Sequence, residues 1–247
     1  MKSTDIANIE RATITAVSPQ AIEELPGWLL PMNVGTVGRA ISAVPLEHVF
    51  EQDALVLVAQ IEARYSANGF KAAFRLPDVV SFDPLRVHLA KVGYHLEQPT
   101  LVQEASAALM RTIAGKLTAE VADKPDAAWA ALFLGEGFDP VDGAQRVKLL
   151  SRAAGAAFAS VRNHSVTVAG GAGNFSHGWA SVHGMRTALA HREQGLAKQV
   201  LASLAQTALD RGYEKVFLQV EEENAAAQAL YSKAGFKTAW RYAYWRK

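Results

Sequence analysis

The chain has 247 residues, of which 50% are hydrophobic and 20% are charged, and it contains no cysteine. This length is enough for one large core or for two domains of about 120 residues each. The net charge of +1 gives no support for a nucleic-acid-binding surface, and the lack of cysteine excludes disulfides and thiolate catalysis. The N-terminus has no signal-peptide pattern, and no apolar run approaches the roughly 18–20 residues of a membrane span. We therefore expect a cytoplasmic protein, a monomer or homodimer, without nucleic-acid or membrane partners.

The first hundred residues show alternating helix and strand patterns. Gly and Pro mark most of the boundaries, for example Asn68-Gly69 after one helix pattern and Pro84 at the start of the next. In chain order we expect helix at both ends of 5–25 with a break at Ser18-Pro19, strands at 27–30 and 39–44 around a turn at 33–38, a helix at 55–65, a strand at 71–76, a helix at 84–91 and a strand at 94–104 that Pro99 interrupts.

A second cycle of helices and strands begins near residue 104. Apolar residues at 196, 197, 200, 201, 204, 208 and 209 lie on one helical stripe, which strongly predicts a helix there. In chain order we expect a strand at 117–122, helices at 125–133 and 141–152, paired strands at 156–162 and 165–170, a glycine-rich turn at 171–178, a strand at 182–187, the helix at 196–210, a strand at 215–220, a helix at 224–233 and a strand at 238–245. This order predicts an α/β fold.

Two parts of the chain resemble each other. Residues 89–94 resemble 231–236, and residues 69–76 resemble 212–220 at nearly the same offset. Chance similarity between α/β segments is the alternative, but two matches in the same order favour two copies of one domain, 1–103 and 104–247. The first copy has Val44-Pro45-Leu46 where the second has a glycine turn, so we expect it to form packing or one wall of a substrate site.

The glycine turn of the second copy reads Arg192-Glu193-Gln194-Gly195-Leu196-Ala197 and joins a strand to the strongly predicted helix. The first N–H groups of a helix have no intrahelical partner, and the helix dipole favours an anion beside them. Glycine allows a ligand to approach the backbone closely. The turn therefore predicts a phosphate or pyrophosphate site. A hydrated structural turn and a nucleotide site are the alternatives.

A second motif lies downstream and reads Asn224-x-x-Ala227-x-x-Leu230-Tyr231-x-Lys233-x-Gly235-Phe236. With the turn Arg-x-x-Gly-x-Ala, this half resembles the GNAT superfamily, whose members transfer an acyl group from acyl-coenzyme A to an amine. The resemblance covers roughly residues 156–245. Among GNAT proteins, the chain is most similar to bacterial members with two GNAT-like halves. This resemblance implies two α/β (α+β) domains, each a mixed, largely antiparallel twisted sheet flanked by helices, with cofactor motifs only in the second domain.

The resemblance also implies how acetyl-CoA would be held, without a metal ion. Backbone N–H groups of the turn would bind its pyrophosphate, the backbone of Met185 and Thr187 would pair with its pantetheine arm, and Asn224 would cap a helix and bind the same arm. The cofactor-binding residues so implied are Met185, Thr187, Arg192, Glu193, Gln194, Gly195, Leu196, Ala197, Lys198, Asn224 and Tyr231. Many members have Gly where this chain has Glu193, and Pro where it has Leu189.

Three residues are candidates for the chemistry. The family motif places Tyr231 where its hydroxyl would donate a proton to the departing sulfur. The sequence does not single out one residue as the base that accepts a proton from the attacking amine. His183 and Glu221 are both candidates, and a structural role is the alternative for each. Strand alternation predicts that His183, Met185 and Thr187 share one face.

We therefore expect an N-acetyltransferase in which the amine attacks the thioester of acetyl-CoA directly, without a covalent enzyme intermediate. The alternative is a catalytically silent acyl-CoA-binding sensor or scaffold. The acceptor is a small-molecule or peptide amine. Trp28, Arg39 and the 171–178 turn are candidates for lining its pocket.

Overall fold

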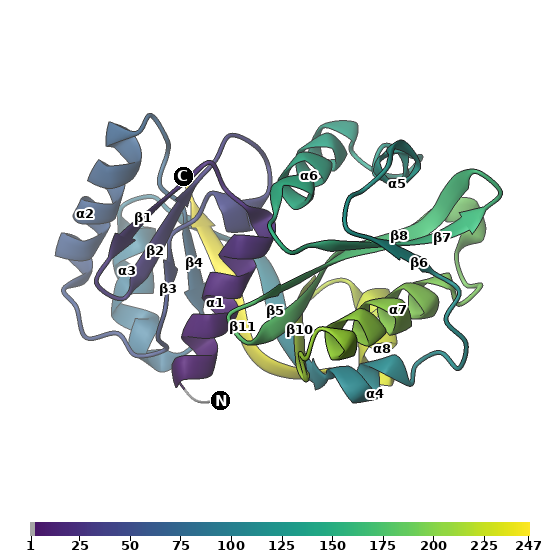
Figure 1. Cartoon of the computed structure of the whole chain (residues 1–247). Coiled ribbons are helices and arrows are strands. Elements are labelled where there is room, and N and C mark those ends of the chain that lie inside the picture. Colours follow the sequence, from purple (N-terminus) through teal and green to yellow (C-terminus); the bar gives the residue numbers. More distant parts are fainter. Residues whose placement is uncertain (1–2) are drawn as a thin grey trace.

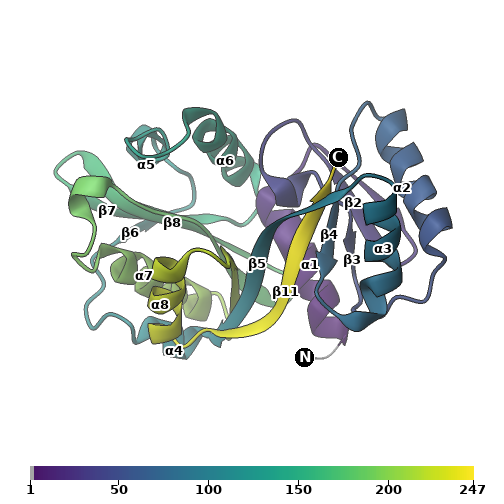
Figure 2. The ribbon, with the colours of Figure 1, turned by 180° about the vertical axis from the view of Figure 1, so that it is seen from behind.

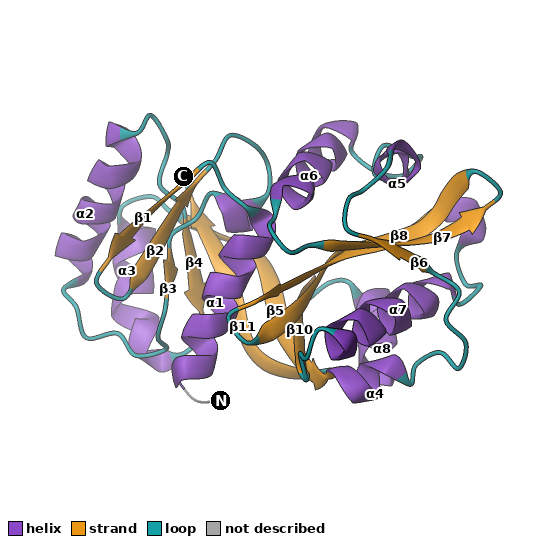
Figure 3. Cartoon of the chain, viewed as in Figure 1, coloured by secondary structure: helices purple, strands orange, loops and turns teal. Residues whose placement is uncertain are grey.

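The computed structural model describes residues 3–247 and shows a mixed α/β fold (Figures 1 and 3). The helices are α1 Ser3–Val17, α2 Ala54–Ala67, α3 Asp83–Lys91, α4 Ala107–Arg111, α5 Ala127–Leu132, α6 Pro140–Arg152, α7 Leu196–Asp210 and α8 Ala225–Lys233. The strands are β1 Ala21–Leu25, β2 Trp28–Met32, β3 Val44–Pro45, β4 Phe74–Pro77, β5 His95–Ser106, β6 Glu120–Ala122, β7 Ala157–Asn163, β8 Val166–Ser176, β9 Trp179–Thr187, β10 Lys215–Glu221 and β11 Lys237–Arg246. No helix of this range is both long and apolar enough to cross a membrane.

One large sheet runs through both halves of the chain. Its strand order is β4-β11-β5-β10-β9-β8-β7-β6, and a separate small sheet has the order β1-β2-β3. All neighbours in the large sheet pair antiparallel except β9 and β10, which pair parallel. The expected mixed, largely antiparallel sheet flanked by helices is therefore confirmed.

The two repeat-like segments have the same order of elements, α2–β4–α3–β5 and α7–β10–α8–β11. Their strands alternate in the large sheet, because β11 lies between β4 and β5, and β5 lies between β11 and β10. Figure 2 shows the long strands β5 and β11 side by side at this junction. Strand β5 also runs across residue 103, the expected boundary. The halves thus share one hydrogen-bonded sheet.

Helices cover both faces of the sheet. Helices α4, α7 and α8 lie on one face of β7–β10, whereas α1, α5 and α6 lie on the other (Figure 1). Val200 and Leu204 of α7 pack on the first face with Val182 and Leu218. On the second face, α1 is held by an ion pair between Glu10 and Arg75 of β4, both at most 2% exposed.

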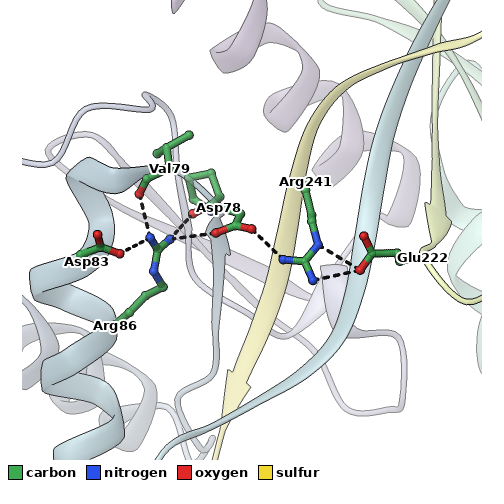
Figure 4. Close-up of polar contacts among 7 residues, drawn as sticks. Asp78, Val79, Asp83, Arg86, Glu222 and Arg241 are labelled. Atoms are coloured by element: carbon green, nitrogen blue, oxygen red, sulfur yellow. Dashed lines mark hydrogen bonds and ion pairs between the residues drawn. The ribbon is translucent and has the colours of Figure 1, made fainter.

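Polar contacts also join the two halves at the surface (Figure 4). Arg241 of β11 donates to Glu222 at 2.9 and 3.0 Å and to Asp78, which follows β4, at 2.7 Å. Arg86 of α3 donates to the Val79 carbonyl at 2.9 Å and lies 3.8 Å from Asp78. Exposed ion pairs of this kind contribute about 0–1 kcal/mol each, so the shared sheet carries most of the connection.

Three expected elements are wrong. The end of segment 5–25 is strand β1 rather than helix, and segment 39–44 is a 3-10 turn (η1, Gly38–Ala40) followed by the short β3. The glycines of 171–178 do not form a turn, because β8 continues to Ser176. They are needed for packing instead: a Cβ on Gly171 would lie 2.6 Å from the Met185 sulfur, and one on Gly173 would lie 3.2 Å from Leu204.

Pro99 does not interrupt β5. The strand continues through it because Gln98 and Pro99 together face one residue of β11, so the proline occupies a bulge. A bulge is one of the few places where a strand accepts proline. The backbone of Gln98 there has φ of +50°.

Candidate active site

The central feature of the site is the place where the sheet opens. Strands β9 and β10 pair only from Ala180–Val216 to Val182–Leu218. Both strands continue beyond these residues, but they no longer pair with each other. A cavity of about 340 Å³ lies in this opening. Its walls come from both faces of the sheet, because Tyr231 of α8 and Arg39 of η1 both line it. The lining includes Arg39, Arg146, His183, Met185, Gln219, Glu221, Asn224, Tyr231, Tyr242 and Tyr244.

A β-bulge shapes the edge that β9 presents to this cavity. Gly170 of β8 pairs with Arg186 of β9, and Ala172 pairs with His183. Two residues of β9, Gly184 and Met185, therefore face one residue of β8, Gly171. Gly184 has φ of +58°. Bulges of this type leave one residue outside the ladder and turn the strand. The backbone beside Met185 is thereby released from regular pairing with β8.

The bulge also overturns the expectation that His183 and Met185 share one face. Met185 packs with the core on the α7 side, next to Val200, whereas the His183 ring lies 6.4 Å from the Phe217 ring in an edge-to-face arrangement on the other side. An inserted residue shifts the two-residue alternation of a strand by one. The sequence shows Gly184 but not that it forms a bulge.

The turn before α7 has the geometry of an anion site. Gly195 is the N-cap with φ of +75°, and no side chain caps the helix. A Cβ on Gly195 would meet no heavy atom within 4 Å, so the space above it is open. Arg192, Glu193 and Gln194 are exposed. The orphaned N–H groups at a helix start and the helix dipole fit a pyrophosphate.

Glu193 has φ of +62°, a left-handed conformation that suits glycine better. The turn therefore carries a side chain on a backbone conformation that is less strained for glycine.

Tyr231 and Asn224 come from α8 and enter the cavity on the α7 side. The Asn224 side chain accepts from the Ala227 N–H at 3.1 Å and so caps α8, as expected. Tyr231 is 7% exposed and packs edge-to-face on Phe236 at 5.9 Å. Burial raises the pKa of Tyr231 to about 12. Its hydroxyl is therefore protonated at neutral pH and can donate.

His183 and Glu221 line the same cavity in different environments. His183 is 4% exposed, and its Nε2 lies 2.8 Å from Ser181 Oγ. Burial and the nearby Arg39 charge lower the pKa of His183 to about 3, so the ring is neutral and weakly basic. Glu221 is exposed at the end of β10, and its carboxylate accepts from Gln98 Nε2 at 2.7 Å.

The cavity thus brings together six of the predicted residues, among them Arg39, which was expected to line the acceptor pocket. His183, Met185, Glu221, Asn224 and Tyr231 line it; Thr187 and residues 192–198 do not, and lie further along the same strand and turn. Trp28, expected near the acceptor, is instead 2% exposed in the core of the first half and lines a separate cavity. Within residues 3–247 no cluster of three or more His, Asp or Glu is arranged to hold a metal ion.

Sequence reasoning missed several residues of the cavity. Gln219, Tyr242 and Tyr244 lie on β10 and β11, and Arg146 comes from α6. The alternating aromatic residues of 238–245 predicted a strand, but nothing in that pattern shows which face meets a cavity.

An open parallel strand pair beside an uncapped helix is thus the central feature of the site. Solved structures share the fold: "GCN5-related N-acetyltransferase from Kribbella flavida" has a TM-score of 0.72 at 17% identity and covers 98% of this chain and 95% of its own. A "Tandem GNAT protein from the clavulanic acid biosynthesis pathway" has a TM-score of 0.59 at 12% identity, and the match covers 98% of this chain and 95% of that protein.

A family model covers residues 3–245 and is described as "Probable histone acetyltransferase Rv0428c C-terminal"; the chain belongs to this family. A relative from Bacillus subtilis (strain 168), the "Uncharacterized N-acetyltransferase YobR", is 27% identical over 242 residues, which make up 94% of each chain. The protein is accordingly a GNAT acyltransferase of the N-acetyltransferase class.

Proposed function

We propose that the protein transfers an acetyl group from acetyl-CoA to a primary amine. The observation that carries this proposal is the cavity between β9 and β10, which Tyr231 lines on one side and which follows β9 as far as Arg186, ahead of the uncapped start of α7. An extended ligand arm between two separating strands, with its phosphates at the helix start, fits this arrangement.

The backbone supplies most of the cofactor contacts in this proposal. N–H groups around Gly195 donate to the pyrophosphate, with Arg192 and Lys198 adding positive charge nearby. The edge of β9 at Met185, which is not paired with β10 beyond Val182–Leu218, pairs with the pantetheine arm and offers a donor to the thioester oxygen as negative charge develops there. Asn224 binds the same arm from α8.

The chemistry then needs one acid and one base. The amine nitrogen forms a bond to the thioester carbon, and the carbon–sulfur bond breaks. Tyr231, whose hydroxyl is protonated at neutral pH as that of an ordinary tyrosine is, donates its proton to the departing sulfur. For the base we favour Glu221, because its carboxylate is exposed beside the cavity, whereas His183 is buried, its Nε2 lies 2.8 Å from Ser181 Oγ, and burial lowers its pKa to about 3. Glu221 accepts the amine proton directly or through one water.

The test is thiol release from acetyl-CoA in the presence of a panel of primary amines. We expect turnover by the wild-type protein, and a fall in kcat of about 10²-fold or more for Tyr231→Phe, the range typical of lost general-acid catalysis. Tyr213→Phe is the matched control, because Tyr213 packs on Phe175 and does not line the cavity. Its kcat should be unchanged.

Two results would contradict the proposal. Micromolar binding of acetyl-CoA without turnover on any amine would favour a silent acyl-CoA sensor. Stabilisation by ATP or NAD but not by coenzyme A, measured as a thermal shift, would show that the turn binds a nucleotide instead.

A further inference from the structure

Arg39 enters the cavity from the first half of the chain, and its position is fixed by close packing. It lies in η1, where Ala40 is fully buried against Val17 and Leu149. On the other side, a Cβ on Gly38 would lie 2.7 Å from the Tyr244 ring and 2.6 Å from Arg246, so only glycine lets the backbone lie this close to β11. The two contacts fix the backbone on both sides of Arg39, whose side chain lines the cavity.

Other arginines around the cavity have carboxylate partners. Arg146 lies 2.5 Å from Asp142, and Arg186 lies 3.8 Å from the same carboxylate. The buried Arg75 behind the wall is paired with Glu10.

Arg39 differs from them. Within residues 3–247 its one side-chain hydrogen bond is to the Gln219 amide oxygen at 3.3 Å, and no carboxylate of that range forms an ion pair with it. Gln219 is itself held, because Tyr242 donates to the same oxygen at 2.8 Å and the Gln219 amide donates to Thr13 at 3.0 Å. The Arg39 guanidinium is thus held in place without a carboxylate in direct contact with it. The Tyr244 hydroxyl, 3.5 Å from that of Tyr242, adds another polar group to this wall.

We propose that Arg39 binds a carboxylate of the acceptor, so that the substrate is an amine carrying a carboxylate on the same molecule. This inference rests on the proposed acetyl transfer and adds the class of acceptor. A guanidinium matches a carboxylate with two parallel hydrogen bonds, and such pairs are stronger in a partly buried site than in water. An uncompensated cation at the wall disfavours a purely cationic amine in the same place.

The geometry also gives the amine a separate place. Glu221 lies two residues beyond Gln219 on β10, which puts their Cα atoms roughly 7 Å apart on the same side of the strand. The carboxylate of the acceptor lies at Arg39, and its amine lies towards Glu221 and the opening between β9 and β10, where the thioester is attacked. The first half of the chain thereby determines the acceptor, while the second half holds the cofactor.

The experiment compares matched acceptors on the full-length protein. Initial rates of thiol release from acetyl-CoA are measured for each amino acid, its C-terminal amide and its decarboxylated amine, with wild type, Arg39→Gln, Arg39→Lys and Arg146→Gln. We expect wild type to prefer the acids by at least tenfold in kcat/KM. Arg39→Gln should remove this preference through KM for the acid, with kcat and the KM for acetyl-CoA unchanged. Arg39→Lys should restore part of it.

Arg146→Gln is the matched control, because this arginine lines the same cavity but is already paired with Asp142. The preference for acids should survive in it. Equal or better turnover of amides and plain amines by wild type, or a preference that persists in Arg39→Gln, would overturn the inference and leave acetyl transfer standing. Absence of turnover on every amine would instead overturn the proposed function, and the assignment of Arg39 with it.

Discussion

The helices α2 and α7 occupy corresponding places in the two repeat-like segments, but their N-termini are closed differently. Asp53 caps α2, and its carboxylate accepts from the N–H groups of Leu55 at 2.9 Å and Val56 at 3.1 Å. Gly195 precedes α7 in a left-handed conformation with no capping side chain. A carboxylate at a helix start uses the same donors that an anionic ligand would need. The first helix is therefore closed to a phosphate, and the second is open.

This difference shows how one fold is used for two purposes. We propose that the segments divided near residue 103 are two copies of one domain, of which the first has lost cofactor binding and now supplies a wall of the acceptor site through η1. Each prediction below changes one side of this comparison.

The largest effect is expected from separating the halves. Strand β5 pairs with both β10 and β11, and β11 also pairs with β4. Expressed alone, residues 3–106 and 107–247 would each expose unpaired strand edges and apolar faces, so we expect neither to fold. Co-expression should restore a folded complex. Circular dichroism and amide NMR spectra test this, and a folded 107–247 fragment that binds coenzyme A would contradict it.

Closing α7 in the manner of α2 should abolish most cofactor binding. Gly195→Asp places a carboxylate among the N–H groups intended for the pyrophosphate, and we expect the Kd for coenzyme A to rise at least tenfold. Gly195→Asn is the matched control, because Asn tolerates the left-handed backbone as Asp does but carries no charge. Its loss of affinity should be distinctly smaller.

The opposite change removes the capping carboxylate from α2 in the first half. Asp53→Ala should lower the free energy of unfolding by about 1 kcal/mol through loss of the cap, with the affinity for coenzyme A unchanged.

For the Gly195 variants, equal losses of affinity in Gly195→Asp and Gly195→Asn would show that charge at the turn is unimportant.

A smaller effect concerns acid stability, to which the first half contributes the half-buried His48 and the second half the buried His183. Burial and nearby arginines lower the pKa of His48 to about 4 and that of His183 to about 3. Both have pKa values near 6.5 when unfolded, so the unfolded chain binds more protons below that pH. Their contribution to stability is fully present above about pH 6.5 and is lost as the pH falls through 6.5 towards 3.

We therefore expect the melting temperature to fall by several degrees between pH 7.5 and 5. His48→Gln should have a shallower fall than wild type in the same scanning calorimetry series. An unchanged slope in that variant would show that His48 does not titrate as described.

The sequence predicted most of this arrangement because its signals were local. The apolar stripe of 196–210 and the Asn224 cap correspond to α7 and α8 as observed. The missed features depend on residues distant in the chain. The glycines at 171 and 173 read as a turn, but their small size serves contacts with Met185 and Leu204. The alternation of β5 and β11 in one sheet depends on long-range pairing, which no local pattern encodes.

In the site, too, the sequence predicted the residues of a local motif but not the features that depend on distant contacts. Tyr231 and Asn224 were found because they belong to a motif, and both line the cavity. The expected shared face of His183 and Met185 failed because alternation does not reveal the bulge at Gly184. Gln219, which holds Arg39, had no signal in the sequence, because its role depends on contacts with both Thr13 and Tyr242.

The most direct test of the central claim is a calorimetric titration of coenzyme A into the full-length protein. Cofactor binding at the start of α7 alone predicts one equivalent bound per chain, with Asp53→Ala binding as wild type does and Gly195→Asp binding at least tenfold more weakly. Two equivalents per chain, or wild-type affinity in Gly195→Asp, would contradict the assignment of cofactor binding to α7 alone.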